Sequence, residues 1–481
     1  MVETKQPLPG GTDEVDVIVL GVGTCGEDLS LRLLDAGLTV AGIEAALVGG
    51  ECPYWACLPS KMMIRAASVL QEARRVNGLA GRADVWPDWS PVAARVRAEA
   101  TGGWDDSTAV QRFERRGGTL IHGRGRLVGP RSVAVNDRTI TARRGIVIAT
   151  GSRPFVPPIP GLAEVDYWTT RDLIAAETLP QSLVVLGGGA VGCELGQVMA
   201  RFGVAVTIVE AGERLLPGEE PEASAAVAAA FAAEGIAVRA GAAAERFWQE
   251  GGQIRLALAG GTEVAAERLL VATGRRVDLA GLGLDAVGLD ETARAIPADD
   301  RLRAAAGVWA MGDVTGIAMF THVALYQSTI VAAGILGQDH PPARYDAIPR
   351  VTFTDPEVGA VGMTEAAARA AGRAVVAVVK SVPSTFRGWL HAASGGVIKL
   401  VVDREAGVLL GATAAGPHAG ELLGMLGLAV HARLPLAELR SMIYAFPTFY
   451  GGIGEAIGAY GRGLTTVLDP GYEGVARLDG T

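Results

Sequence analysis

Apolar runs and glycine-rich loops alternate in the same order at two places along the chain. In the first unit, the apolar run 16–20 leads into a G-x-G-x-x-G loop, a helical stretch over 27–36, and a second apolar run over 38–43 that ends at Glu44. A strand, a glycine-rich turn and a helix in this order are typical of a β-α-β unit that binds a dinucleotide. Glu44 lies 18 residues beyond the last glycine, where a carboxylate can accept hydrogen bonds from an adenosine ribose. The glycines are Gly21 for the tight turn, Gly23 for the pyrophosphate and Gly26 for close helix packing.

The same pattern recurs further along the chain. The apolar run 182–186 precedes a second loop, and the run 204–209 leads to Glu210, again 18 residues beyond the last loop glycine. Each unit also has a later strand, over 146–151 and 269–274, that ends in Ala-Thr-Gly, as expected where a returning strand meets the nucleotide crevice. The residues that this pattern places at the two crevices are Thr150, Gly151, Gly187, Gly189, Gly192 and Gly274. The repetition predicts an α/β fold that binds two dinucleotides.

Two cysteines five residues apart follow the first glycine loop. Cys52 and Cys57 belong to a set of only 4 cysteines in 481 residues, too few for a disulfide scaffold. A regular helix would separate their Cα atoms by about 7.5 Å, more than the roughly 4.4–6.8 Å that a disulfide tolerates, so we expect an irregular helix start between them. Cys25 and Cys193 lie inside the two separate glycine loops, which disfavours a four-sulfur zinc site, and no metal is expected. The spacing favours a redox disulfide, with Cys57 near the positive end of a helix, where a thiolate is stabilised.

Composition narrows the possible partners. The formal net charge is −9 and no Lys/Arg-rich stripe interrupts the chain, so a nucleic-acid partner is not expected. No apolar run reaches about 18 residues, and residues 1–14 are polar with several acids, so neither a membrane span nor a signal peptide is expected and a cytoplasmic location is predicted.

The length of 481 residues favours about three domains. Residues 90–116 are expected to form solvent-facing helices, and residues 470–481 a loose tail.

Taken together, these motifs resemble the class I pyridine nucleotide-disulfide oxidoreductases, the family of dihydrolipoamide dehydrogenase, glutathione reductase and mercuric reductase. Further matches are the stretches 149–154 with 159–161, 310–314, 321–324 and 352–358. The resemblance implies two Rossmann-like dinucleotide-binding domains and a C-terminal α+β dimerisation domain, and hence a homodimer. The implied boundaries are an FAD domain over 1–155 and 278–344, an NAD(P) domain over 156–277, and a dimerisation domain over 345–481.

The resemblance also implies roles for individual residues. Cys57 would lie nearer the flavin and Cys52 would attack the substrate, while Lys61 would lie beside the flavin and pair with Glu194. His322 would lie near the isoalloxazine, either contacting it through its backbone or packing as an ordinary structural histidine. The remaining cofactor residues implied by the match are Gly50, Gly312 and Asp313, the last of which would bind the ribityl chain. Glu210, at the end of the apolar run 204–209, favours the ribose hydroxyl of NADH over the 2′-phosphate of NADPH.

The chain departs from the family in its C-terminal segment. Family members carry a His-Glu pair in a His-Pro-Thr-x-x-Glu motif, and here Phe446 and Gly451 stand at those two positions. Loss of a general acid-base typically costs about 10²- to 10⁴-fold in rate, which disfavours dihydrolipoamide and glutathione as substrates. Tyr444 and Tyr450 are candidate proton donors, although a phenol has a pKa near 10.

Three functions therefore stay open. The first is reduction of a small-molecule disulfide through the two cysteines. The second is reductive thioether cleavage, as in 2-ketopropyl-coenzyme M oxidoreductase/carboxylase, which shares a phenylalanine in place of the histidine. The third is direct electron transfer from flavin to a quinone-type acceptor, which would not need the cysteines. Tyr54 and Trp55, between the cysteines, could shape a pocket for an aromatic substrate or could simply pack on a neighbouring helix.

Overall fold

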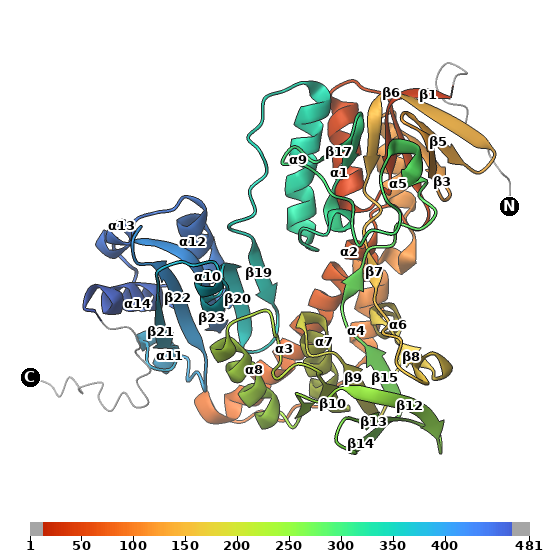
Figure 1. Ribbon diagram of the computed structural model, residues 1–481. Coiled ribbons are helices and arrows are strands. Elements are labelled where there is room, and N and C mark those ends of the chain that lie inside the picture. The colour runs from red at the N-terminus through yellow and green to blue at the C-terminus, as the bar shows by residue number, and fades with distance from the viewer. Residues whose placement is uncertain (1–12, 464–481) are drawn as a thin grey trace, which may run out of the picture.

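The N-terminal unit is a mostly parallel sheet with helices on one face (Figure 1). Along β1, Val17 and Val19 face a layer formed by α1, α5 and α9, while Ile18 and Leu20 face a second apolar layer. Burial on both faces explains why the strand is continuously apolar. The computed structural model describes residues 13–463. The elements are β1 (Glu14–Leu20), α1 (Thr24–Asp35), β2 (Val40–Glu44), α5 (Ser107–Arg115), β3 (Thr119–His122), β4 (Arg126–Gly129), β5 (Ser132–Val135), β6 (Arg138–Ile148), β17 (Arg303–Ala305), β18 (Val308–Ala310), the 3-10 turn η5 (Gly312–Thr315) and α9 (Thr321–Leu336).

The order of strands in this sheet shows that the chain leaves it and later returns. The strand β18 pairs in parallel with β6, although 159 residues of other structure separate the end of β6 from Val308. The path out and the path back run side by side as a two-stranded ribbon, β7 (Arg153–Pro154) against β16 (Arg275–Arg276). The turn η5 and helix α9, which follow β18, are thereby brought next to the first glycine loop.

The second unit is built around a fully parallel sheet of order β11-β10-β9-β15-β8. A small antiparallel sheet, β12-β13-β14, packs beside it. The elements are the 3-10 turn η3 (Leu162–Glu164), β8 (Tyr167–Trp168), α6 (Thr170–Ala175), β9 (Ser182–Leu186), α7 (Ala190–Arg201), β10 (Ala205–Val209), α8 (Pro221–Ala233), β11 (Ala237–Arg239), β12 (Ala244–Glu250), β13 (Gln253–Leu258), β14 (Glu263–Ala266) and β15 (Arg268–Val271). The 3-10 turn η4 (Leu284–Val287) comes after the return of the chain and packs against β4 of the first unit.

The C-terminal unit is an antiparallel sheet of order β19-β20-β23-β22-β21 with helices packed on it. Figure 1 shows it beside the first two units, with α13 and α14 at its outer side. The elements are β19 (Pro349–Thr352), β20 (Glu357–Gly362), α10 (Glu365–Ala370), β21 (Val375–Ser381), α11 (Phe386–Leu390), β22 (Val397–Asp403), β23 (Val408–Gly416), α12 (Ala419–His431), α13 (Leu436–Ser441) and α14 (Gly451–Gly461).

The predicted fold class is confirmed, with a few differences in detail. Helix α1 begins at Thr24 rather than at residue 27, because the last loop glycine already belongs to its first turn. The stretch 90–116 forms α4 (Ser90–Arg95), the π-helix η1 (Val96–Ala100), the 3-10 turn η2 (Gly102–Trp104) and α5, and it is not wholly solvent-facing, since Val92, Val96 and Phe113 are buried. The predicted tail, 470–481, lies outside the described residues. No helix within 13–463 has both the length and the apolar character needed to cross a bilayer.

Candidate active site

The helix that carries the cysteines is broken between them, as predicted. The short helix α2 (Glu51–Tyr54) ends before Trp55, and the long helix α3 (Cys57–Leu79) begins at Cys57. The break is at Ala56, whose φ of −140° and ψ of −94° are not helical. Cys57 is therefore the first residue of a 23-residue helix, where unpaired N–H groups and the helix dipole favour negative charge.

The two sulfurs are free thiols that interact with each other and with Thr321. The Cys57 Sγ lies 3.3 Å from the Thr321 Oγ1, at the start of α9. Hydrogen bonding from Cys52, supported by Thr321 and by the positive charge of Lys61, lowers the pKa of Cys57 to about 6. The same hydrogen bond to Cys57, together with burial, raises the pKa of Cys52 well above its ordinary value. These effects favour the negative charge on Cys57 and the proton on Cys52.

Lys61 pairs with Glu194, as the resemblance implied. The Lys61 Nζ lies 2.8 Å from the Glu194 Oε2, one turn along α3 from Cys57, and the ammonium also lies 4.8 Å from the centre of the Phe353 ring. The other oxygen of Glu194 accepts the backbone N–H of Phe353 at 2.8 Å. Glu194, on α7, is almost fully buried, so its charge is balanced by both partners. One carboxylate therefore joins all three units of the chain.

The glycine loops leave space where a pyrophosphate would approach. A methyl group built on Gly26 would lie 2.0 Å from the Gly21 carbonyl oxygen, and one on Gly192 would lie 2.0 Å from that of Gly187. By contrast, a methyl group on Gly189 would meet nothing within 4 Å, and one on Gly23 only the Gly50 Cα at 3.7 Å. The outer glycines are thus required by packing, while the middle ones border open space. This is the shape of a dinucleotide loop, and the residues fit the two cofactors.

The two predicted acidic residues occupy equivalent positions. Glu44, the last residue of β2, accepts the Val22 N–H at 2.7 Å and the Ala46 N–H at 2.8 Å. Glu210, directly after β10, accepts the Gly188 N–H at 2.7 Å and the Gly212 N–H at 2.6 Å. Each carboxylate holds its glycine loop to its strand end.

Asp313 lies in a polar cluster that also contains residues not predicted from the sequence. Its carboxylate accepts the Ser152 hydroxyl at 2.5 Å, and the Arg275 guanidinium donates to the same hydroxyl at 2.7 Å. The preceding residue, Gly312, has a φ of 78° and donates its N–H to Gln327 at 2.6 Å. Thr150, Gly151 and Gly274 lie at the ends of the paths into this region, where both glycines have positive φ.

Glu51, directly before Cys52, joins the same cluster. It pairs with Arg171 and lies 3.5 Å from Arg275. Ser152, Arg275 and Glu51 were not predicted as site residues. The first two lie in or next to the Ala-Thr-Gly motifs, which is the signal that could have found them.

His322 has a structural partner. Its ring nitrogen Nε2 lies 2.9 Å from the Pro349 carbonyl oxygen, and its ring stacks on Phe320 at 5.2 Å between centroids. Burial lowers its pKa below the ordinary histidine value. The side chain therefore fastens α9 to β19, as expected of a structural histidine.

In the C-terminal segment both tyrosine hydroxyls form hydrogen bonds with the backbone. The Tyr444 hydroxyl donates to the Leu439 carbonyl at 2.9 Å, and the Tyr450 hydroxyl accepts the Ala445 N–H at 2.7 Å. Phe446 is 73% exposed and meets Phe386 edge-on at 4.9 Å. In Figure 1 this segment, between α13 and α14, lies at the outer side of the C-terminal unit and well away from α2. Within one chain it does not reach the cysteines.

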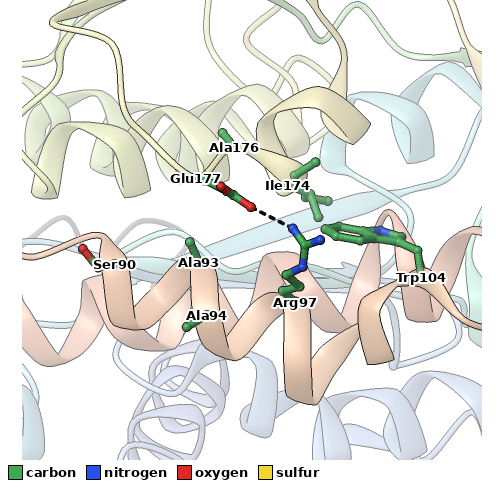
Figure 2. A pocket seen from close by; sticks show the side chains of 9 residues that line it. Ser90, Ala93, Ala94, Arg97, Trp104, Ile174, Ala176 and Glu177 are labelled. Atoms are coloured by element: carbon green, nitrogen blue, oxygen red, sulfur yellow. Dashed lines mark hydrogen bonds and ion pairs between the residues drawn. The ribbon is translucent and has the colours of Figure 1, made fainter.

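The aromatic residues between the cysteines pack inward. Tyr54 is buried, and Trp55 stacks on Trp104 at 5.1 Å, which accounts for both side chains without a substrate. Trp104, Arg97 and Glu177 line a pocket of about 330 Å³, and Figure 2 shows the ion pair between Arg97 and Glu177. Groups of three or more potential metal ligands are absent from residues 13–463.

The fold and the cysteine site together define a flavin-dependent disulfide oxidoreductase. Residues 15–328 match the family model "Pyridine nucleotide-disulphide oxidoreductase", and residues 348–457 match its dimerisation domain. The chain belongs to this family, and it is an enzyme of the NAD(P)H:disulfide oxidoreductase type.

Several relatives are similar over most of their length. Dihydrolipoyl dehydrogenase of Thermus scotoductus is 34% identical, over 94% of this chain and 99% of the relative. Mercuric reductase of Shigella flexneri is also 34% identical, over 92% of this chain and 80% of the relative. Among solved structures, the HOCl-induced flavoprotein disulfide reductase RclA from Escherichia coli has a TM-score of 0.81 and 28% identity, covering 92% of this chain and 99% of that one.

Proposed function

We propose that the chain, as a homodimer, passes electrons from NADH through FAD to a Cys52–Cys57 disulfide and on to a small-molecule disulfide. The observation that carries this proposal is the position of Cys57 at a helix start, next to Cys52 and Thr321 and flanked by Lys61, where a thiolate is favoured. The balanced reaction consumes NADH, one proton and the acceptor disulfide RSSR, and gives NAD⁺ and two thiols.

The residues around the first glycine loop suit FAD. Gly23 and Gly50 would border its pyrophosphate, Glu44 its adenosine ribose, and Asp313 its ribityl chain. When bound, FAD would accept a hydride from the nicotinamide and reduce the disulfide. Lys61 would hold a positive charge beside it, balanced by buried Glu194. The proposed domains are an FAD domain over 1–155 and 278–344, an NAD(P) domain over 156–277 and a dimerisation domain over 345–481.

Glu210 supports a preference for NADH. Both of its oxygens already accept backbone N–H groups, so the carboxylate is held at the strand end as a fixed negative charge. Such a charge accepts a ribose hydroxyl and repels a phosphate. Arg214, the cation nearest in sequence, donates to the carbonyls of Leu216, Pro217 and Glu219 and is turned away from that role.

In the acceptor half-reaction, Cys52 gives up its proton to water as its sulfur attacks the acceptor disulfide, and one acceptor thiolate is released. The Cys57 thiolate then attacks the Cys52 sulfur, re-forms the disulfide and releases the second thiolate. The two leaving thiolates take up protons from water, because Phe446 and Gly451 replace the usual acid-base pair. Acceptors whose thiols have low pKa values need this proton least, so we expect them to be reduced fastest.

Reductive thioether cleavage is the second candidate function. The observation that favours it is the exposed, apolar Phe446, which a partner subunit would place at the cysteines in the position of the usual histidine. An apolar residue there would exclude protons from a carbanion.

An anaerobic dithionite titration of the FAD-bound protein tests the disulfide mechanism. We expect uptake of about four electrons per flavin, two for FAD and two for the disulfide, with a long-wavelength thiolate-to-flavin band midway. Uptake of two electrons without that band would rule out the mechanism and direct the search to quinone-type acceptors. A positive result is followed by NADH oxidation assays with aromatic disulfides and with ketone thioethers, which separate the first two candidate functions.

A further inference from the structure

The hydroxyl of Thr321 meets the reactive cysteines from a distant part of the chain. Its Oγ1 lies 3.3 Å from the Cys57 Sγ and also interacts with Cys52, and these sulfurs are its hydrogen-bond partners within residues 13–463. Thr321 is the first residue of α9, a 16-residue helix that is mostly buried against α1. The position of the hydroxyl is therefore set by a rigid element rather than by a loop.

The groups that face the Cys57 sulfur come from three elements. Cys52 on α2 offers an S–H group, Lys61 on α3 a positive charge, and Thr321 on α9 an O–H group. The charge of Lys61 is shared, because its ammonium is paired with Glu194 at 2.8 Å. A thiolate can only accept hydrogen bonds, so towards ionised Cys57 the Thr321 hydroxyl is the donor.

These contributions change during turnover. Once Cys52 is bonded to the acceptor as a mixed disulfide, it has no S–H group left to donate. Thr321 then provides the remaining side-chain hydrogen bond to Cys57, at the stage when Cys57 must be ionised to attack. In this chain no histidine stands at position 446 to supply positive charge at that stage.

We propose that Thr321 is a catalytic residue whose hydroxyl donates the hydrogen bond that keeps Cys57 a thiolate while Cys52 is bonded to the acceptor. In that step the Cys57 sulfur attacks the Cys52 sulfur and a new S–S bond forms. The bond from Cys52 to the acceptor sulfur breaks, and that sulfur leaves with the electron pair and takes a proton from water. This inference rests on the proposed disulfide mechanism.

The test uses FAD-bound protein carrying Cys52→Ala, which mimics the loss of the Cys52 S–H group. In this background the long-wavelength thiolate-to-flavin absorbance is titrated with pH. Adding Thr321→Val should move its midpoint upward by about one to two pH units, since a hydrogen bond to a charged group has about that effect. Thr321→Ser retains the hydroxyl and should restore the midpoint. Thr329→Val is the matched control, because its hydroxyl bonds the Tyr326 carbonyl at 2.8 Å within the same helix.

The outcomes separate the two proposals. A clear band in Cys52→Ala with the same midpoint in Thr321→Val would overturn the role of Thr321 and leave the proposed function intact. A Cys52→Ala protein with no band at any pH would overturn both. If Thr321→Val binds no FAD, the pH dependence of iodoacetamide alkylation gives the midpoint instead, because Cys25 and Cys193 are buried and Cys57 is the remaining reactive thiol. An unchanged alkylation midpoint would again overturn the role of Thr321.

Discussion

Glu194 is the residue on which the three units of the chain meet. Its side chain is only 4% exposed. One carboxylate oxygen accepts a hydrogen bond from the Lys61 ammonium, and the other accepts one from the Phe353 N–H. Removing one partner of a buried charge leaves that charge uncompensated, which is more costly than the pair itself is stabilising.

Replacing Lys61 by methionine should therefore destabilise the folded protein. We expect a loss of about 1–3 kcal/mol in the free energy of unfolding, because Phe353 still satisfies one oxygen of Glu194. Lys61→Arg keeps the charge and should lose less than half as much. Urea unfolding of the FAD-bound protein, followed by flavin fluorescence, measures both. Equal losses in the two variants would show that the charge of Lys61 is not what stabilises Glu194.

Glu210 allows a prediction about coenzyme choice. Glu210→Gln removes the fixed charge and places an amide N–H₂ against one of the two backbone donors. The ratio of kcat/KM for NADH to that for NADPH should fall by about tenfold or more, as expected when a hydrogen bond to a charged group is lost. Glu213→Gln, at an exposed neighbouring position, is the control and should leave the ratio unchanged. A ratio that stays constant in Glu210→Gln would contradict the proposed preference.

At the scale of elements, two glycines at the N-terminus of α7 are expected to have different tasks, one in packing and the other in binding the nucleotide. Gly192→Ala places a methyl group 2.0 Å from the Gly187 carbonyl oxygen and should destabilise the protein by about 1–3 kcal/mol or more. In Gly189→Ala the methyl group meets nothing within 4 Å and φ is an ordinary −75°, so the loss of stability should stay near the roughly 1 kcal/mol typical of alanine at an N-cap. The KM of this variant for NADH should nevertheless rise, because the methyl group projects into the space proposed for the pyrophosphate. Thermal unfolding and initial-rate kinetics on the pair decide this, and a normal KM in Gly189→Ala would contradict the assignment.

The elements also show which features could be predicted from the sequence. The strands, the glycine loops and the glutamates were predictable because short-range periodicity and spacing determine them. The break between Cys52 and Cys57 followed from disulfide geometry alone. Thr321 was not predictable as a partner of Cys57, since 264 positions separate them and only the return of the chain into the first sheet brings α9 to the cysteines. The burial of one face of the stretch 90–116 was missed because Val92 and Val96 pack against residues of the second unit, which lie far along the chain.

At the scale of the whole molecule, one buried lysine joins the second and third units. Lys399, on β22, lies 2.9 Å from Glu220, 2.8 Å from Glu222 and 2.9 Å from Glu365. Lys399 and Glu220 are both nearly inaccessible to solvent. Their ion pairs, rather than an apolar contact alone, fix the position of α8 against the C-terminal sheet.

Lys399→Met should lower the free energy of unfolding by about 3–5 kcal/mol, because it leaves several carboxylates without their cation. Arg369→Met provides a matched comparison, since Arg369 also pairs with Glu365 but is largely exposed. Its loss should stay below about 1 kcal/mol. Calorimetry on the two variants tests the difference, and comparable losses would show that burial of the lysine is unimportant.

The C-terminal unit exposes apolar residues that the proposed dimer would cover. Ile443 is 94% exposed in the single chain, three residues before Phe446. Ile443→Asp should convert the dimer to monomer and abolish acceptor reduction, because each site would lack its partner. Light scattering after size-exclusion chromatography measures the change. Val128→Asp, at an exposed apolar position in the N-terminal unit, should remain dimeric. A dimeric Ile443→Asp protein would place the interface elsewhere.

The carboxylates of Glu44 and Glu210 each hold a loop closed while facing the proposed nucleotide. Exchanging an acid that has both tasks for a neutral or basic residue removes an acceptor from the backbone amides of the loop as well as the negative charge. A descendant of this protein that adopted a phosphorylated coenzyme would first have to rebuild the turn itself. The proposed choice of coenzyme is in this sense coupled to the folding of the loop, and a substitution that alters one would alter the other.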